Sequence, residues 1–294
     1  MRTHPDTLWM HVQVYLLRAV GWAISLVFHL SGSSKTSLTL QARFHPEREP
    51  LRCEVYLPEA YITTETQPFP AYLNLHGGAF IAGDPADDGE FCRHIARKCN
   101  CVVVSLGYSL APEHQFPAAI HDAAAAVAWL KGDTCPLRID PGRLALGDFS
   151  AGANIAAAAA QLVPGEVSAL VNFYSVSDLS RPAVDWIGRL ARLAYIPQGC
   201  DLKDPLLSPL RAAPEALPDI VISIIAGIDP SRDDNLALAH ALEGNRSKRS
   251  VWQHYEGVHH GWTHVPGWAP VANEEKKWEA YDIVAAELSR AWVL

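Results

Sequence analysis

Cysteine pairs with metal-ligand spacing are missing from this chain of 294 residues. Its six cysteines form no CxxC pair, and only one residue separates Cys99 from Cys101, so we expect no metal site, and we expect no other cofactor. A basic leader with an apolar stretch and a small-residue cleavage site is not evident at the N-terminus either. We therefore expect free thiols in a reducing compartment, the cytoplasm.

Clusters of positive charge are equally scarce. The chain has 24 Lys and Arg residues against 32 Asp and Glu residues, a net charge of −8, and this balance argues against a nucleic-acid partner. The one basic group, Arg246 with Lys248 and Arg249, is typical of a solvated turn before a strand. A hydrophobic share of 49% with 19% charged residues is in the range of globular domains, so the length predicts one large α/β domain or two small ones.

An uninterrupted membrane span is also lacking. Leu8–Leu30 is long and apolar enough to suggest one, but His11, Arg18 and His29 interrupt it. Arg18 would lie near the centre of the bilayer at a cost of about 2.5–3.5 kcal/mol. We therefore expect residues 1–34 to form cap helices packed over a pocket, with membrane contact through this segment as the alternative.

Short apolar runs alternate with helical patterns after a Ser- and Gly-rich break at Ser31–Ser34. The candidate strands are Leu38–Phe44, Arg52–Leu57, Ala71–His76, Cys101–Tyr108, Arg143–Asp148, Val167–Tyr174, Asp219–Gly227 and Ser250–Glu256. The candidate helices are Asp88–Lys98, Pro117–Lys131, Ala151–Leu162, Asn235–Glu243 and Ala272–Trp292.

This alternation predicts an α/β fold with a mostly parallel, eight-stranded sheet. The first strands follow one another through short polar connections, as antiparallel neighbours do. Later runs such as Cys101–Ser105 and Ile220–Ile225 are continuously apolar, which is typical of parallel strands covered by helices on both faces. Residues Asp178–Arg211, with a helix-like piece at Pro182–Ala194, are longer than a simple crossover needs and predict an inserted lid over the pocket.

A serine stands between a predicted strand and an Ala-rich helix, in the segment Asp148-Phe149-Ser150-Ala151-Gly152. This is the context of a nucleophile elbow, where small neighbours permit a sharp turn that exposes the serine. The amides at the start of the next helix would face developing negative charge. Asp148 occupies the place of the first glycine in Gly-x-Ser-x-Gly, and an ordinary capped turn would also explain the segment.

A second motif, His76-Gly77-Gly78-Ala79-Phe80, directly follows the predicted strand residues Ala71–Leu75. Ester hydrolysis passes through a tetrahedral oxyanion, so amide groups must already point at that oxygen. Glycines allow a loop to present its amides without a Cβ in the way. A simple Gly-Gly turn is the alternative. The expected donors are the amides of Gly77, Gly78 and Ala79, joined by that of Ala151.

An acidic residue and a histidine follow the last two predicted strands. Asp229 comes first after its strand and could accept a hydrogen bond from a catalytic imidazole, whereas Asp233 and Asp234 are better explained as the start of the next helix. An Asx turn is the alternative for Asp229.

Three histidines lie close together after the last strand: His259, His260 and His264. We favour His260 as the base because Gly261 follows it. Ser150, Asp229 and His260 then appear in the chain order typical of an α/β-hydrolase, each at the end of a strand.

With these motifs the chain resembles the hormone-sensitive-lipase-like family of α/β-hydrolases, which includes carboxylesterases. The resemblance covers roughly Ala71 to Trp262, and its most specific part is Tyr108–Ala119, YSLAPEHQFPAA, which no turn or helix rule would generate. That segment is expected to shape the loop under the active site. The chain departs from the family at Ala79, in place of a third glycine, and at Asp148 and Phe149, in place of a Gly-Asp pair.

The resemblance implies a serine esterase with Ser150 as nucleophile, His260 as base and Asp229 as its orienting partner. It also implies a mobile helical cap and an α/β-hydrolase catalytic domain over residues 35–294, with a cap insertion at about 178–211. The apolar and aromatic residues of the cap point to a small-molecule ester with an apolar or aromatic group, such as a secondary metabolite. Acyl transfer, lactone formation or cyclisation in the same pocket, a non-catalytic ligand receptor and a homodimer remain open.

Overall fold

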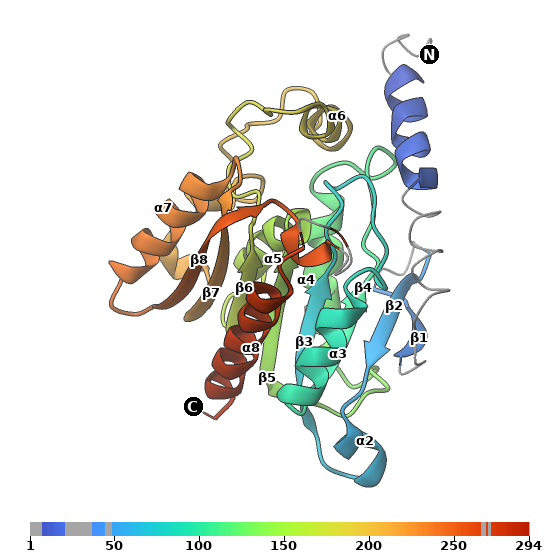
Figure 1. Ribbon diagram of the computed structural model, residues 1–294. Coiled ribbons are helices and arrows are strands. Elements are labelled where there is room, and N and C mark those ends of the chain that lie inside the picture. Colours follow the sequence, from blue (N-terminus) through green and yellow to red (C-terminus); the bar gives the residue numbers. More distant parts are fainter. Residues whose placement is uncertain (1–7, 21–36, 45–48, 266–268, 270–271, 294) are drawn as a thin grey trace.

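An eight-stranded sheet forms the centre of the computed structural model, which describes residues 8–20, 37–44, 49–265, 269 and 272–293 (Figure 1). The strands are β1 (Ser37–Ala42), β2 (Leu51–Tyr56), β3 (Phe69–Leu75), β4 (Val102–Leu106), β5 (Ile139–Phe149), β6 (Ala169–Phe173), β7 (Ile220–Ile228) and β8 (Arg249–His259). Their order across the sheet is β1-β2-β4-β3-β5-β6-β7-β8. The predicted α/β-hydrolase sheet is confirmed.

The direction of the strands changes twice along this order, because β2 alone runs opposite to the other strands. β1 pairs with β2, and β2 with β4, in antiparallel fashion, whereas every pair from β4 to β8 is parallel. The expected antiparallel start therefore holds for β1 and β2, but β3 does not lie beside β2, because β4 is inserted between them. The carboxyl ends of β3, β5, β7 and β8 consequently meet at one edge of the sheet, where ligands bind in open α/β sheets.

Helices cover both faces of the sheet. They are α2 (Glu59–Thr63), α3 (Gly89–Lys98), α4 (Ala118–Lys131), α5 (Ala151–Leu162), α6 (Trp186–Tyr195), α7 (Arg232–Glu243) and α8 (Glu274–Ala291). α4 packs against α5 on one face, and α3 packs against α8 on the other. Strand side chains alternate between two apolar cores: Leu73 and Leu75 belong to the α4–α5 side, whereas Tyr72 belongs to the α3–α8 side.

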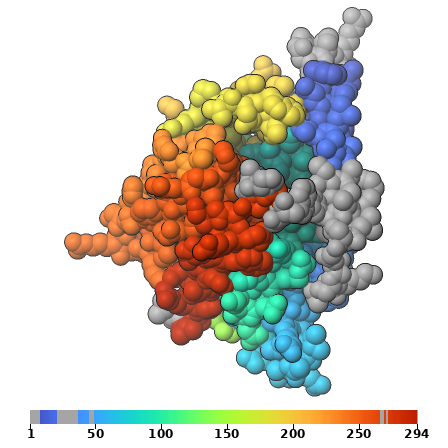
Figure 2. All heavy atoms as spheres, in the orientation of Figure 1, coloured from blue at the N-terminus to red at the C-terminus, as the bar shows by residue number. Residues whose placement is uncertain are grey.

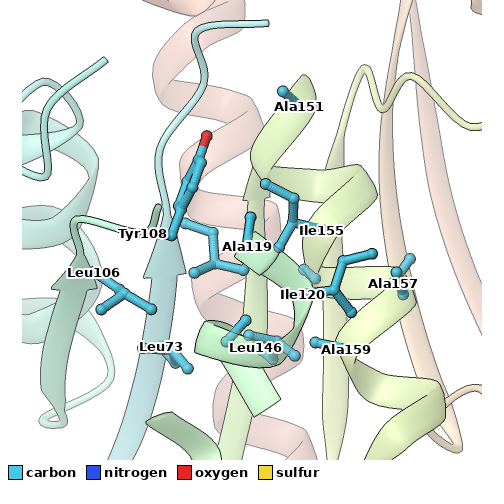
Figure 3. Packing of buried hydrophobic residues seen from close by; sticks show 14 of the residues in the cluster. Leu73, Leu106, Tyr108, Ala119, Ile120, Leu146, Ala151, Ile155, Ala157 and Ala159 are labelled. Carbon is cyan, nitrogen blue, oxygen red and sulfur yellow. The ribbon is translucent and has the colours of Figure 1, made fainter. Parts of the chain in front are cut away.

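α5 packs closely against the sheet at the edge where the motifs meet. Leu73, Leu146 and Ile155 interlock in the core between this helix and the sheet (Figure 3). Where α5 begins, a Cβ on Gly152 would lie only 1.7 Å from the carbonyl oxygen of Leu75, so no larger residue fits there. The fully buried alanines 156–159 allow the same close approach.

Several element boundaries differ from the predicted ones. α6 begins at Trp186 rather than Pro182, because the Asp185 side chain caps it by accepting a hydrogen bond from the amide of Gly188 at 2.6 Å. α7 begins at Arg232, three residues before the predicted start, with Asp233 and Asp234 in its first turn as expected. The short helix α2 has no sequence prediction.

Residues 8–20 form a helix beside α6 at the top of the molecule (Figures 1 and 2). Met10 and Val14 are buried, and Arg18 donates hydrogen bonds to the carbonyl oxygens of Ile81 (2.6 Å) and Ala111 (2.7 Å). The rest of the predicted cap segment, residues 1–7 and 21–34, lies outside the described residues. Among the helices that the structure describes, none is both long and apolar enough to cross a bilayer.

Candidate active site

Ser150 sits on a sharp turn between β5 and α5. Its φ of 54° and ψ of −114° lie in a region that non-glycine residues seldom occupy. Two backbone hydrogen bonds hold this conformation: the Ser150 amide donates to the Phe173 carbonyl at 2.9 Å, and the Asn154 amide donates to the Ser150 carbonyl at 3.2 Å. The turn lifts the serine side chain above the carboxyl edge of the sheet, as a nucleophile elbow does.

The side chains of Ser150, His260 and Asp229 form one hydrogen-bonded chain. Ser150 Oγ lies 2.6 Å from His260 Nε2, and His260 Nδ1 lies 2.7 Å from Asp229 Oδ2. With a neutral imidazole, Nδ1–H donates to the carboxylate and Nε2 accepts from the hydroxyl. The other oxygen of Asp229 accepts the amide of Ser231 at 2.7 Å, so the carboxylate that orients the imidazole is itself held in place.

The neighbouring residues of the same type have other partners or positions. Asp233 pairs with Arg232 at 2.9 Å, and Asp234 pairs with Arg181 at 2.8 Å. His259 is exposed and ends β8. Of the acidic and histidine side chains after the last two strands, the structure therefore brings Asp229 and His260 to Ser150.

The glycine loop after β3 runs directly alongside the serine. A Cβ on Gly77 would lie 3.9 Å from the Cβ of Ser150. Gly78 has a φ of +120°, and a Cβ there would lie 2.1 Å from the carbonyl oxygen of Ala82, so only glycine fits. Ala79 adopts a φ of 55°. The amides of Gly78 and Ala79 donate to no described residue, which leaves both of them available to a ligand oxygen.

Ala151 is buried and opens α5. An amide in the first turn of a helix has no acceptor within that helix, and it carries the positive end of the helix dipole. The amide of Ala151, the residue directly after Ser150, is therefore a further candidate donor.

The YSLAPEHQFPAA segment supports this loop from below. The Tyr108 hydroxyl donates to the His76 carbonyl at 2.8 Å, and the two rings stack with centroids 4.3 Å apart. The Ala111 amide donates to the Phe80 carbonyl at 2.9 Å. Both contacts end on the backbone of the glycine loop, so Tyr108 and Ala111 fix its shape rather than touch a ligand.

A second histidine–carboxylate pair lies beside the first, and sequence reasoning missed it. His264 Nε2 lies 2.8 Å from Asp88 Oδ1, and His264 Nδ1 lies 3.2 Å from the Tyr174 hydroxyl. The Tyr174 ring packs edge-on against the ring of His260 with centroids 5.1 Å apart. Burial raises the pKa of Tyr174 well above its ordinary value, so the hydroxyl stays protonated. The closeness of His264 to His260 in the sequence is the one signal for this pair.

These groups open into a cavity of about 950 Å³, large enough for a drug-sized ligand. Its floor comprises the glycine loop, Ser150 and His260, and its opposite wall includes Ile187 and Ala191 of α6. Tyr195 of α6 also lines the cavity and stacks on Phe80 with ring centroids 4.1 Å apart. Most of these side chains are apolar, so the site can bury an apolar group next to a reactive hydroxyl.

A protein-family model described as the alpha/beta hydrolase fold matches residues 72–264. Curated relatives include an arylesterase of Saccharolobus solfataricus, which is 32% identical over an alignment covering 58% of this chain and 61% of the arylesterase. The esterase LipI of Mycobacterium tuberculosis is 33% identical, with 70% of this chain and 69% of LipI covered. The matched part thus spans about three fifths to two thirds of these relatives.

Solved structures of similar proteins have the same fold. A hyperthermophilic esterase from Pyrobaculum calidifontis superposes with a TM-score of 0.79 at 28% sequence identity, over 96% of this chain and 92% of the esterase. A thermostable carboxylesterase cloned from a metagenomic library gives a TM-score of 0.79 at 25% identity, over 95% of this chain and 97% of the carboxylesterase.

Proposed function

Because this chain belongs to the hormone-sensitive-lipase-like family of α/β-hydrolases, we propose that it is a serine hydrolase that cleaves carboxylic esters. The observation that carries this proposal is the unbroken contact from Ser150 Oγ through the imidazole of His260 to the carboxylate of Asp229. The names of the relatives, which include an arylesterase and an ethyl acetate hydrolase of Pseudomonas putida, support the same reaction.

In the proposed reaction, Ser150 Oγ attacks the ester carbonyl while His260 Nε2 takes its proton. Asp229 keeps the imidazole in the reactive tautomer and stabilises the imidazolium that forms. The negative charge on the former carbonyl oxygen is received by the amides of Gly77, Gly78, Ala79 and Ala151. The imidazolium then protonates the leaving alcohol, and an acyl group remains on Ser150.

Water then hydrolyses the acyl-enzyme, with the proton transfers of the first step in reverse order. His260 takes a proton from a water molecule, the resulting hydroxide attacks the acyl carbonyl, and Ser150 leaves with the proton. The products are a carboxylic acid and an alcohol, and no redox step or cofactor is required. Acyl transfer, lactone formation or cyclisation would use the same acyl-enzyme with another nucleophile in place of water.

We further propose a small-molecule ester with an apolar or aromatic group as substrate, because apolar side chains line most of the cavity. The free thiols of all six cysteines support a reducing location, the cytoplasm. A receptor without catalysis is disfavoured, because none of the three side chains of the proposed triad is lost and all three are in contact.

The test is turnover of p-nitrophenyl butyrate and hexanoate by the native protein and by Ser150→Ala. We expect kcat/KM to fall by about 10³-fold or more, because the residual rate comes from the oxyanion donors alone. Ser247→Ala, which changes an exposed serine, is the matched control and should keep full activity. Equal activity of Ser150→Ala and the native protein would reject the proposal.

A further inference from the structure

The wall of the cavity that α6 forms carries a positive charge. α6 lines this wall with Ile187, Ala191 and Tyr195, and Arg192 lies among them. Arg192 is half-buried, so its guanidinium is partly removed from water. Such a group in an apolar wall normally has a counter-charge or several hydrogen-bond acceptors.

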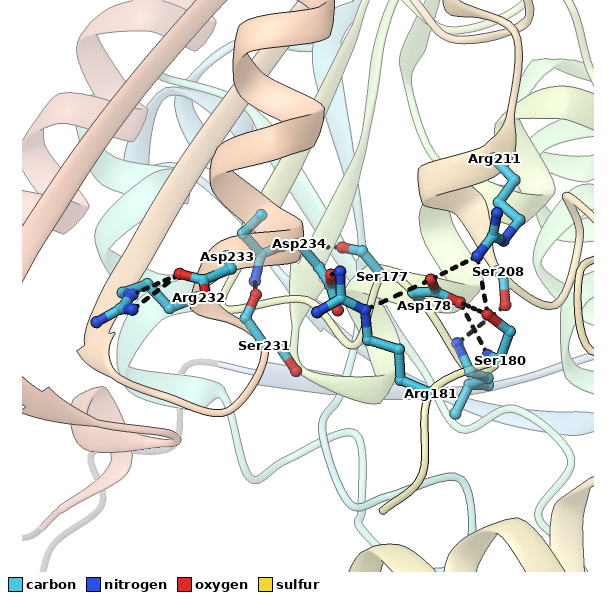
Figure 4. A network of polar contacts seen from close by, with 12 residues as sticks. Ser177, Asp178, Ser180, Arg181, Ser208, Arg211, Ser231, Arg232, Asp233 and Asp234 are labelled. Carbon is cyan, nitrogen blue, oxygen red and sulfur yellow. Dashed lines mark hydrogen bonds and ion pairs between the residues drawn. The ribbon is translucent and has the colours of Figure 1, made fainter. Parts of the chain in front are cut away.

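Two other arginines near this wall, Arg181 and Arg211, have such partners. Arg211 lies 3.0 Å from Asp178, and Arg181 lies 2.8 Å from Asp234 (Figure 4). Asp178 also accepts hydrogen bonds from the amide and the hydroxyl of Ser180. The two aspartates and two arginines therefore balance one another, and they leave no carboxylate in contact with Arg192.

The side chain of Arg192 forms no hydrogen bond or ion pair with any residue that the structure describes. Burial lowers its pKa below the ordinary value, while the field of Asp178 partly opposes this effect. The guanidinium keeps its charge at neutral pH, since even a lowered arginine pKa stays far above 7. It is thus a charged, partly dehydrated group that faces a ligand cavity without a protein partner.

We infer that Arg192 binds a carboxylate carried by the ester substrate, so that the preferred substrates are esters with an anionic group on the same molecule as the cleaved bond. This inference rests on the proposed esterase function and names its substrate class. A single guanidinium matches a carboxylate, because two parallel N–H groups can bind its two oxygens. A phosphate dianion fits less well, since one guanidinium balances only one of its two charges and Asp185 also lines the cavity.

The apolar remainder of the cavity fits this substrate class. The cleaved ester would lie between Ser150 and the glycine loop, the carboxylate would lie at α6, and an apolar spacer would fill the volume between them. Neutral esters of the same length would bind through the spacer alone. The contribution of Arg192 is therefore to specificity, and the chemical step at Ser150 does not depend on it.

The experiment compares matched pairs of esters that differ in charge. The probes are the mono-p-nitrophenyl esters of adipic and suberic acid, set against p-nitrophenyl heptanoate and nonanoate. A second arm places the carboxylate on the alcohol side, with the butyrate ester of 4-hydroxybenzoate set against that of 4-hydroxybenzamide. Each pair is measured with the native protein, Arg192→Met, Arg192→Lys and Arg189→Met.

We expect Arg192→Met to lower kcat/KM for the carboxylated ester of at least one arm by about ten- to a hundredfold, the range of a charge-assisted hydrogen-bonded pair. The neutral ester of that arm should change by less than about threefold. Arg192→Lys should retain part of the preference for the carboxylated ester that Arg192→Met loses, because lysine keeps the positive charge but lacks the two parallel N–H groups of the guanidinium. Arg189→Met is the matched control, since Arg189 lies on the same helix, is exposed and does not line the cavity.

Binding separates this inference from the proposed function. Adipate and suberate are titrated by calorimetry into Ser150→Ala, with and without Arg192→Met. Binding that Arg192→Met abolishes supports the anion site even if no ester is hydrolysed, whereas hydrolysis of neutral esters supports the function alone. An Arg192→Met change that affects charged and neutral esters equally, or leaves both unchanged in both arms, would overturn the inference.

Discussion

At the scale of single residues, the proposed chemistry depends on three side chains that lie at the ends of strands. Each of them follows its predicted strand within four residues, which is why it could be predicted. Ser150, Asp229 and His260 follow β5, β7 and β8, whose carboxyl ends meet at one edge. The partners of His264 and the isolation of Arg192 could not be predicted, because both depend on which distant side chains come within about 4 Å in the folded chain. The catalytic roles stay predictions until variants are measured.

The role of Asp229 can be tested with an isosteric change. Asp229→Asn keeps the shape but can donate to His260 Nδ1, which stabilises the tautomer whose Nε2 carries the proton and cannot accept from Ser150. We expect kcat to fall by about 10³- to 10⁴-fold with the thermal midpoint nearly unchanged. Asp233→Asn, an exposed neighbour paired with Arg232, should keep native kcat in the same assay. A loss of less than tenfold in Asp229→Asn would contradict the assigned role.

Asp148 carries a different prediction, one of stability. Its carboxyl is fully buried, neither oxygen has a hydrogen-bond partner among the described residues, and burial raises its pKa well above the ordinary 3.8. A group with a raised folded pKa contributes stability below its unfolded pKa and loses it as pH rises toward the folded one. Asp148→Asn removes the titration while nearly keeping the volume.

Asp148→Asn should therefore be more stable than the native protein at pH 8, by about 1–2 kcal/mol, and the difference should shrink toward pH 4. Urea unfolding at several pH values measures this difference. Asp133→Asn, at an exposed position, should show no such trend. A difference that stays constant or grows toward pH 4 would contradict the buried, protonated state of Asp148.

At the scale of elements, strand and helix positions followed from periodicity, whereas exact ends and neighbours did not. The bounds of α5 coincide with the predicted ones, because the elbow at Ser150 predicts where the helix begins and the alanine run predicts that it is buried. α6 starts late because its cap, Asp185, is one polar residue among several. β4 lies between β2 and β3 in the sheet. No local sequence pattern predicts this order, because the pairing of a strand depends on contacts with strands that are distant in the sequence.

The glycine loop gives a prediction at this scale, because its shape depends on one residue. Gly78→Ala would place a Cβ 2.1 Å from the Ala82 carbonyl at a φ of +120°, so the loop must shift and its amides with it. We expect kcat to fall by about 10²-fold or more, with KM less affected. Ala79→Gly, at a φ of 55° that glycine adopts easily, is the matched control and should retain activity. Equal rates for both variants would show that the loop amides do not bind the oxyanion.

At the scale of the whole molecule, the alternation of strands and helices predicted an α/β sheet, and the chain order of the motifs with the family resemblance predicted the α/β-hydrolase fold; the family comparison agrees with both. The division into a cap over residues 1–34 and a domain over 35–294 stays a prediction, because part of that segment lies outside the described residues. The described part, residues 8–20, contributes Leu17 to the cavity, and its docking depends on Arg18.

Arg18 joins this helix to the YSLAPEHQFPAA segment. It pairs with Glu113 at 2.7 Å and lowers the pKa of that carboxyl to about 2 from its ordinary 4.5. The depressed pKa contributes stability above pH 4.5 that is lost as pH falls toward 2. Because Glu113 is well exposed to water, the contribution is about 1 kcal/mol or less.

Arg18→Ala should loosen the N-terminal helix. We expect a KM for p-nitrophenyl hexanoate raised about two- to tenfold, because Leu17 would no longer close the cavity, with a nearly unchanged kcat. The stability loss relative to the native protein should be larger at pH 7 than near pH 2, because the pair with Glu113 is lost at low pH whereas the bonds to the carbonyls of Ile81 and Ala111 do not titrate. Gln13→Ala on the same helix is the control. An unchanged KM would mean that residues 8–20 take no part in binding the substrate.

The central claim is that the acyl group is carried by Ser150, and a mechanism-based label tests it most directly. The native protein is treated with a p-nitrophenyl alkylphosphonate, and the modified peptide is identified by mass spectrometry. The account predicts one phosphonyl group per chain, on Ser150, formed much more slowly in a His260→Ala variant. A stoichiometric label on another residue, or labelling at an undiminished rate without His260, would contradict it.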